Sequence, residues 1–167
     1  SQNALTMKYY VIAGEPSGDL HGSKLMRGIR HNDPEASFRF SGGDRMAEVG
    51  GAENMLYHYK QMSFFGFVQV AKNLRTIFRQ MDDVKADIER FNPDVIILID
   101  YPAFNLRIAK WAKSRGIKVY YYIAPKVWAW KERRVKSLRR YVDRLYTIFP
   151  FESEYFRGHG IEPHFFG

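Results

Sequence analysis

The sequence predicts an α/β protein whose core is a doubly wound, Rossmann-like parallel sheet. Short β-prone apolar runs alternate with helical patterns along the whole chain, an order typical of βαβ units. One run, Asp94–Ile99 (DVIILI), is apolar at every position after its first residue, as expected for a strand covered by helices on both faces. The 167 residues suffice for one domain with a hydrophobic core.

Each predicted strand is a short run rich in β-branched or aromatic residues, and most runs are followed by a glycine, proline or aspartate. The first, Lys8–Ala13, ends at Gly14, and the central strand, Asp94–Ile99, ends at Asp100. The other predicted strands are Ser37–Phe40, Asn54–Tyr59, Lys118–Ile123, Arg144–Phe149 and His164–Phe166.

Helices are predicted where apolar residues recur every three or four positions. The first helix begins near Ser17–Asp19 and carries Leu20, Leu25, Met26 and Ile29 on one face. The longest helix, Phe67–Phe91, is expected to turn these side chains toward the core: Phe67, Val70, Ala71, Leu74, Ile77, Phe78 and Met81. The other predicted helices are Asp44–Val49, Phe104–Ser114, Arg133–Val142 and Phe151–Gly158.

Composition and charge exclude several classes of protein. The absence of cysteine excludes disulfide frameworks and cysteine-based metal sites. No apolar run approaches the length of a bilayer span, so membrane contact is expected to be peripheral. The excess of 26 basic over 18 acidic residues, a net charge of +8, favours phosphorylated substrates, anionic lipid or nucleic acid. Because no nucleic-acid motif is present, we expect no nucleic-acid partner.

The two ends of the chain carry expectations of their own. Residues 1–6 have neither a basic start nor an apolar stretch, so we expect an expression remnant ahead of a native start at Met7. The chain stops inside a strand-like run. We therefore expect residues 7–167 to form one domain of a longer protein.

Four unusual segments follow predicted strands, where ligands bind in doubly wound sheets. They cover residues 14–19, 100–105, 124–130 and 149–152, and they are predicted to converge on one crevice. In the first segment, small residues and backbone N–H groups at a helix start are suited to binding an anion; the residues are Gly14, Glu15, Ser17, Gly18 and Asp19. Spacing alone favours an ordinary strand-to-helix turn capped by Ser17 or Asp19, and the segment matches neither glycine-rich nucleotide motif.

The other segments supply candidate catalytic and substrate-binding groups. Asp100 directly follows an apolar strand, so it could act as a general base toward a sugar hydroxyl or serve as a helix cap. Asn105 could orient a substrate hydroxyl or cap the same helix. Trp128 and Trp130 could stack on a sugar ring or pack on acyl chains, and core packing is the favoured role for at least one of them.

Two stretches indicate contact with a membrane. Phe64, Phe65 and Val68 fall on the flank of the long helix that also carries Lys72, Arg75 and Arg79, a combination suited to the headgroup region of an anionic bilayer. Burial of these phenylalanines under a loop is the alternative. The second stretch is basic and could be a solvated helix face or bind phosphate; it contains Lys131, Arg133, Arg134, Lys136, Arg139 and Arg140.

Four motifs, in order, resemble those of lipid A disaccharide synthases. Residues 11–19 (VIAGEPSGD) resemble that family's G-E-x-S-G-D turn, and residues 41–46 (SGGDRM) resemble its G-G-x-x-M segment. Residues 99–105 (IDYPAFN) match I-D-x-P-x-F-N, and residues 124–131 (APKVWAWK) match S-P-x-V-W-A-W-[RK] with Ala124 in place of serine. The matches span Met7–Gly167, and the four together are highly specific.

The resemblance implies the N-terminal, acceptor-binding half of an inverting GT-B glycosyltransferase whose C-terminal donor-binding domain is absent from this chain. Such enzymes join UDP-2,3-diacylglucosamine to 2,3-diacylglucosamine 1-phosphate, giving a β-1,6-linked disaccharide and UDP, with no metal in the catalytic step and no cofactor. It also implies a cytoplasmic enzyme, peripherally associated with the cytoplasmic leaflet of an anionic inner membrane.

Carried over by position, the resemblance makes Asp100 the candidate base and places the Ser17–Asp19 turn along the cleft. It places Phe64, Phe65, Phe67 and Val68 in an apolar, membrane-facing patch. Two alternatives stay open at this point: a stand-alone peripheral lipid-binding module, and a GT-B relative that acts on another UDP-sugar, such as an epimerase or the peptidoglycan transferase.

Overall fold

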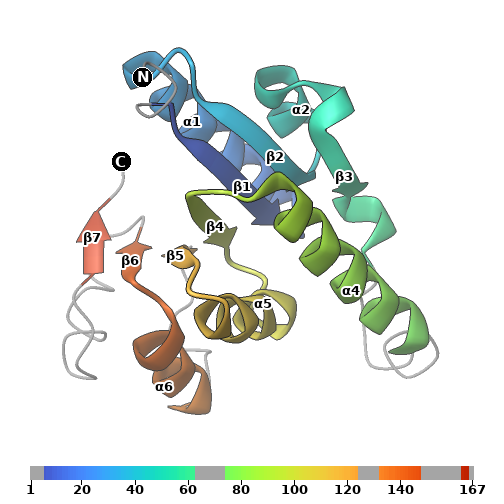
Figure 1. The fold of residues 1–167 in the computed structure, drawn as a ribbon, viewed down its shortest axis with the longest axis vertical. Coiled ribbons are helices and arrows are strands. Elements are labelled where there is room, and N and C mark those ends of the chain that lie inside the picture. The colour runs from blue at the N-terminus through green and yellow to red at the C-terminus, as the bar shows by residue number, and fades with distance from the viewer. Residues whose placement is uncertain (1–5, 63–73, 124–131, 148–162, 166–167) are drawn as a thin grey trace. The chain divides into compact units, whose positions relative to one another are not determined.

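The computed structural model describes residues 6–62, 74–123, 132–147 and 163–165 (Figure 1). Strands and helices alternate in chain order: β1 (Lys8–Ala13), α1 (Pro16–Asn32), β2 (Ser37–Gly42), α2 (Asp44–Gly50), η2 (Ala52–Asn54), β3 (Met55–His58), η3 (Tyr59–Gln61), α4 (Leu74–Phe91), β4 (Val95–Ile99), α5 (Pro102–Ser114), β5 (Lys118–Ile123), α6 (Glu132–Tyr141), β6 (Arg144–Thr147) and β7 (Pro163–Phe165). This alternation is the one that the sequence predicts.

The chain forms two compact units, residues 1–94 and residues 95–167, called here the first and second unit. In the first unit, β1, β2 and β3 lie side by side in the order β3-β2-β1, and both pairs are parallel. In the second unit, the order is β4-β5-β6-β7, again with every pair parallel. All four residues at the end of β1 and all five of β4 are buried. Burial on both faces explains why these strands are apolar without alternation.

In the first unit, helices cover both faces of the sheet. The face that carries Phe40 is covered by α1, whose Met26 and the Phe40 ring both lie against Gly50. On the opposite face, Tyr10 of β1 and Arg39 of β2 are register partners, and both contact Asp87 of α4. Helices on both faces of a parallel sheet are the defining feature of the predicted fold class.

Three polar residues attach α4 to the first unit. Gln80 donates to the carbonyl oxygen of Gln61 at 2.6 Å, and Asp83 accepts the hydroxyl of Tyr57 at 2.5 Å. The buried Asp87 accepts the Tyr10 hydroxyl at 2.7 Å and also lies 2.7 Å from Nε of Arg39. Positions 80, 83 and 87 recur at helical spacing, so these groups lie on one face of α4.

The predicted core face of the long helix needs a correction. Ile77 and Met81 are buried as expected, but Leu74 and Phe78 are each 48% exposed. The described helix buries Gln80 and Asp87 as well as apolar residues, because these polar side chains have hydrogen-bond partners in the sheet and its connections. Assigning the core face from apolar residues alone therefore rotates the helix too far toward Leu74 and Phe78. Residues 67–73 of the predicted helix lie outside the described part.

The other predicted elements differ from the structure mainly at their ends. Helix α5 begins at Pro102 rather than Phe104, because proline has a suitable backbone angle at a first helical position and no N–H to satisfy. Strand β2 continues to Gly42. Predicted helix Phe151–Gly158 lies outside the described residues.

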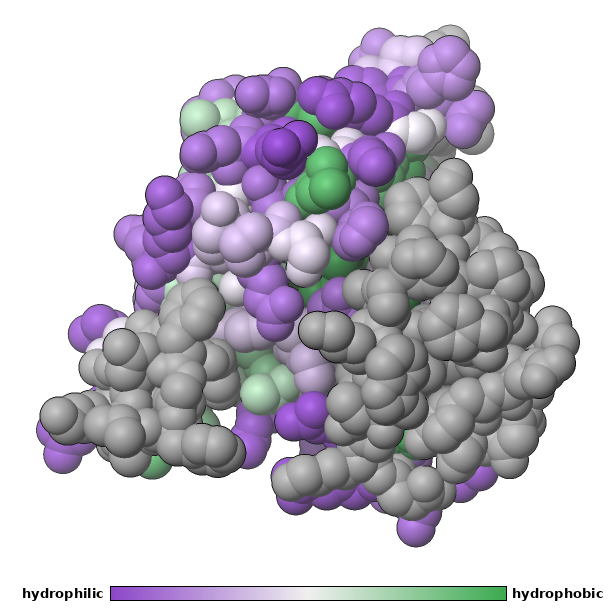
Figure 2. All heavy atoms as spheres, turned by 180° about the vertical axis from the view of Figure 1, so that it is seen from behind, coloured by the Kyte–Doolittle hydropathy of each residue, from purple (hydrophilic) through white to green (hydrophobic). Residues whose placement is uncertain are grey.

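The fold class is thus confirmed as Rossmann-like α/β with parallel strands. On the face drawn in Figure 2, the described surface is mostly hydrophilic, and hydrophobic side chains appear there as separate patches. Among the described residues, no helix combines the length and apolar character needed to cross a membrane.

Candidate functional site

The turn after β1 is tied to the turn after β2 by the carboxylate of Asp19. This side chain is 4% exposed and accepts three backbone N–H groups at the start of α2: Gly43 at 2.8 Å, Met46 at 3.0 Å and Arg45 at 3.1 Å. These are N–H groups that a helix start leaves without an internal partner. Asp19 therefore acts as a capping carboxylate for α2, a helix that begins 25 residues after it.

The same turn begins α1 without a side-chain cap. Glu15 is the N-cap residue, its backbone is extended, and Pro16 occupies the first helical position. The prediction that Ser17 or Asp19 caps this helix is therefore wrong. Ser17 is exposed and Glu15 is half-buried, whereas Gly14 and Gly18 are buried.

Gly43 permits the close approach between the two turns. A Cβ atom there would lie 2.6 Å from Oδ2 of Asp19 and would also collide with the Tyr59 ring. The G-G segment at residues 42–43 is therefore required by packing against Asp19. At the same rim, His58 lies 3.2 Å from Asp44, and its Nδ1 accepts the N–H of Lys60, so Nε2 carries the proton shared with Asp44.

Farther along α1, His21 is half-buried. Burial lowers its pKa, with a smaller contribution from the charge of Lys24. The imidazole is therefore neutral near pH 7.

The turn after β4 has an unusual backbone. Asp100 and Tyr101 have φ angles of 45° and 55°, so two consecutive residues with side chains adopt the left-handed conformation. Each such residue costs about 1–2 kcal/mol relative to its ordinary conformation. A pair persists only where neighbouring groups hold it in place, and such strain is frequent at functional sites.

Hydrogen bonds hold both backbone groups of Asp100. Its N–H donates to the carbonyl oxygen of Tyr122 at 2.9 Å. Its carbonyl oxygen accepts the Tyr121 hydroxyl at 2.6 Å and the Asn105 side-chain amide at 2.9 Å. The next residue, Tyr101, is 6% exposed and stacks on Phe104 with ring centroids 5.7 Å apart. The carboxylate belongs to a half-buried residue whose main chain is fixed on both sides.

Asn105 is fully buried in this turn. Its amide nitrogen donates to the carbonyl oxygens of Ile99 and Asp100, so it closes the turn from inside rather than capping α5. The N-cap residue of α5 is Tyr101, which has no side-chain cap, so the helix-cap alternatives for Asp100 and Asn105 are wrong.

The structure thus groups the predicted site residues within each unit. Gly14–Asp19 join the Gly43 turn in the first unit, and Asp100 joins Asn105 and β5 in the second. The crevice predicted to join these groups stays a prediction. Trp128, Trp130 and residues 64–72 lie outside the described part. Within that part, no group of three or more histidine, aspartate and glutamate side chains is arranged to hold a metal ion.

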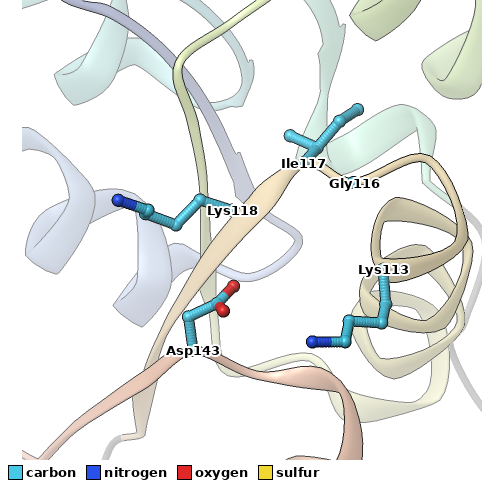
Figure 3. Close-up of a pocket in the computed structure, with 5 residues that line it drawn as sticks. All are labelled: Lys113, Gly116, Ile117, Lys118 and Asp143. Atoms are coloured by element: carbon cyan, nitrogen blue, oxygen red, sulfur yellow. The ribbon is translucent and has the colours of Figure 1, made fainter.

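A pocket of about 200 Å³ lies in the second unit, away from the Asp100 turn (Figure 3). Its lining includes Lys113 and Gly116 before β5, Lys118 at the first position of β5, and Asp143 just before β6. These positions mark the amino ends of the strands, whereas Asp100 follows the carboxyl end of β4. In a sheet of this class, ligands bind at the carboxyl ends, so this pocket is not the candidate site.

Sequence reasoning missed Tyr121, whose hydroxyl bonds the main chain of Asp100. The signal was present, because a tyrosine inside an apolar strand brings a hydroxyl that needs a hydrogen-bond partner when it is buried. Tyr121 is fully buried. Which of the three tyrosines at 120–122 would face the turn depends on strand register, which the sequence leaves open.

Comparison with known proteins adds a family. Residues 9–167 match the model of the lipid-A-disaccharide synthetase family. The chain is 42% identical over 157 residues to the lipid-A-disaccharide synthase of Geobacter sulfurreducens, covering 94% of this chain and 40% of that protein. It is 36% identical to the synthase of Coxiella burnetii (strain Dugway 5J108-111), covering 94% and 41%. The chain therefore spans about two fifths of the length of these relatives.

Solved structures support the fold at much lower identity. A UDP-GlcNAc 2-epimerase from Neisseria meningitidis, bound to UDP-GlcNAc, has a TM-score of 0.64 at 11% identity, covering 96% of this chain and 46% of that one. The UDP-GlcNAc 2-epimerase of Methanocaldococcus jannaschii has a TM-score of 0.56 at 14% identity, covering 95% and 43%. These likenesses show a shared fold. Together with the family match over nearly the whole chain, they lead to one conclusion: this chain belongs to the lipid-A-disaccharide synthetase family.

Proposed function

We propose that this chain is the acceptor-binding part of a glycosyltransferase of lipid A biosynthesis. In the proposed reaction, 2,3-diacylglucosamine 1-phosphate attacks UDP-2,3-diacylglucosamine, giving the β-1,6-linked disaccharide and UDP. Membership of the family supports this assignment. Because the chain spans two fifths of its relatives, we assign donor binding to a further domain and expect this chain alone to turn over no substrate.

Asp100 is the proposed general base. It would accept the proton of the acceptor 6-hydroxyl as that oxygen attacks the anomeric carbon, while the bond from that carbon to UDP breaks on the opposite side with inversion. The observation that carries this role is the left-handed turn, which holds the Asp100 main chain from both sides at the carboxyl end of a buried strand. A fixed main chain limits the positions open to the carboxylate, which favours proton transfer.

The base is tested by Asp100→Asn in the complete protein, with UDP release as the assay. Loss of a positioned base costs about 10²- to 10⁴-fold in rate, and we expect kcat to fall within that range. The matched control is Asp94→Asn at the other end of β4, where the side chain accepts the N–H of Lys8 and an amide oxygen can do the same. We expect this control to stay within twofold of wild type. An Asp100→Asn enzyme with wild-type kcat would remove Asp100 as the base.

We further propose that the start of α4 contacts the cytoplasmic leaflet of an anionic membrane, as a peripheral attachment. Leu74 and Phe78 are exposed apolar residues one helical turn apart, and the exposed Arg75 and Arg79 follow them at the same spacing. Apolar side chains beside cations suit the boundary between headgroups and acyl chains. This pair adds to the predicted patch of Phe64, Phe65, Phe67, Val68 and Lys72.

Sedimentation with vesicles tests the attachment. We expect binding to vesicles that contain anionic phosphatidylglycerol, weaker binding to neutral phosphatidylcholine vesicles, and a loss of binding on Leu74→Ser with Phe78→Ser. Phe91→Ser, at the other end of α4, is the control with an aromatic residue removed from the same helix. Equal binding by the double variant and wild type would contradict a membrane role for this face.

A further inference from the structure

The hydroxyl of Tyr121 bonds the one residue to which the proposed function assigns proton transfer. Tyr121 lies in the middle of β5, is fully buried, and is 21 residues from Asp100 in the chain. Its hydroxyl donates to the Asp100 carbonyl oxygen at 2.6 Å. A buried tyrosine hydroxyl is a strong constraint, because leaving it or its acceptor without a partner costs free energy.

The direction of the constraint follows from the backbone. The carbonyl oxygen that Tyr121 contacts belongs to the peptide between Asp100 and Tyr101, the two left-handed residues. Rotation of this peptide would relax both residues toward ordinary angles and would turn the Asp100 side chain with it. The bond from Tyr121 opposes that rotation, and the Asn105 amide opposes it from the side of α5.

We propose that Tyr121 is a positioning residue for the reaction: through the Asp100 carbonyl oxygen, it fixes the direction of the Asp100 carboxylate toward the acceptor hydroxyl. This inference rests on the proposed function, because it requires Asp100 to be the base. Tyr121 touches no reacting atom in this scheme. Its contribution is the orientation of a group that does.

The test is a double-mutant cycle in the complete protein, with Tyr121→Phe and Asp100→Ala made singly and together. Phenylalanine retains the buried ring and removes only the hydroxyl. A displaced catalytic group lowers kcat without a change in substrate affinity, so we expect Tyr121→Phe to lower kcat about tenfold with KM within twofold of wild type. In the Asp100→Ala background, Tyr121→Phe is expected to have no further effect on kcat, because the residue it positions is gone.

The matched control is Tyr120→Phe, on the same strand but with its ring against Tyr146. We expect it to leave kcat and KM unchanged. If Tyr121→Phe proves too unstable at the assay temperature, Asn105→Ala removes the other donor to the same carbonyl oxygen and should give the same pattern of kcat, KM and dependence on Asp100.

The outcomes separate the two proposals. An unchanged kcat in Tyr121→Phe, or an equal loss in wild-type and Asp100→Ala backgrounds, would overturn the positioning role and leave the general base intact. A wild-type kcat in Asp100→Ala would overturn both. A loss of kcat that disappears in the Asp100→Ala background supports the positioning role.

Discussion

The two strand-end turns, one in each unit, contain the same residue types and use them in opposite ways. After β1, glycines give the chain room, and the carboxylate of Asp19 points inward to bind the N–H groups of α2. After β4, a buried amide and a tyrosine hydroxyl hold the main chain, and the aspartate is half-buried. The difference indicates that Asp19 maintains the fold, whereas the second turn keeps its carboxylate available for chemistry.

The largest expected effect tests the structural role of Asp19. Asp19→Ala leaves three N–H groups at the start of α2 without their acceptor, and each bond to a charged group contributes about 1.5–3 kcal/mol. Because such contributions are not additive, we expect the free energy of unfolding to fall by about 3 kcal/mol in denaturant titrations. Asp44→Ala, whose exposed carboxylate is in the same region, should cost less than about 1 kcal/mol. Similar losses in both variants would contradict the comparison.

A smaller effect of opposite sign is expected in the second turn. Glycine accepts a positive φ without strain, so Asp100→Gly should be about 1 kcal/mol more stable than Asp100→Ala while both lack the base. Asn92→Gly and Asn92→Ala provide the control at φ 53°, where the parent residue already tolerates the left-handed conformation. Thermal and denaturant unfolding measure both differences. Equal stability of the two Asp100 variants would show that the turn is not strained.

The smallest expected effect concerns alkaline pH and the tyrosine–carboxylate pairs of the first unit. Burial and the hydrogen bond to Asp83 raise the pKa of Tyr57 to about 12, and burial and Asp87 raise that of Tyr10 well above its ordinary value. The unfolded chain loses these protons near pH 10, before the folded chain does. Stability from this source is therefore complete below pH 10 and falls as the pH rises from 10 toward 12.

Unfolding in denaturant at pH 9 and pH 11 checks this expectation. Tyr10→Phe and Tyr57→Phe should each reduce the loss of stability between the two pH values. Tyr120→Phe in the second unit, whose ring is not paired with a carboxylate in this way, is the matched control. An equal alkaline loss in wild type and the Tyr10 variant would contradict the role of the buried pair.

Much of the fold follows from local sequence patterns. The continuous apolar run at 95–99 and the alternation of strand and helix depend on neighbours in sequence, so they were predictable. The partners of Asp19 and Tyr121 were not, because they lie 24 and 21 residues away and depend on strand register. The exposure of Leu74 and Phe78 was also mispredicted, since hydrophobicity alone does not reveal that Gln80 and Asp87 find buried partners.

The three polar attachments of α4 have a consequence for how that helix is oriented. A helix with apolar residues on several sides can roll about its own axis with little change in buried area. Hydrogen bonds at Gln80, Asp83 and Asp87 are directional, and each is satisfied at one azimuth only. The side of α4 that carries Leu74 and Phe78 is therefore set from within the first unit, by groups at the far side of the same cylinder.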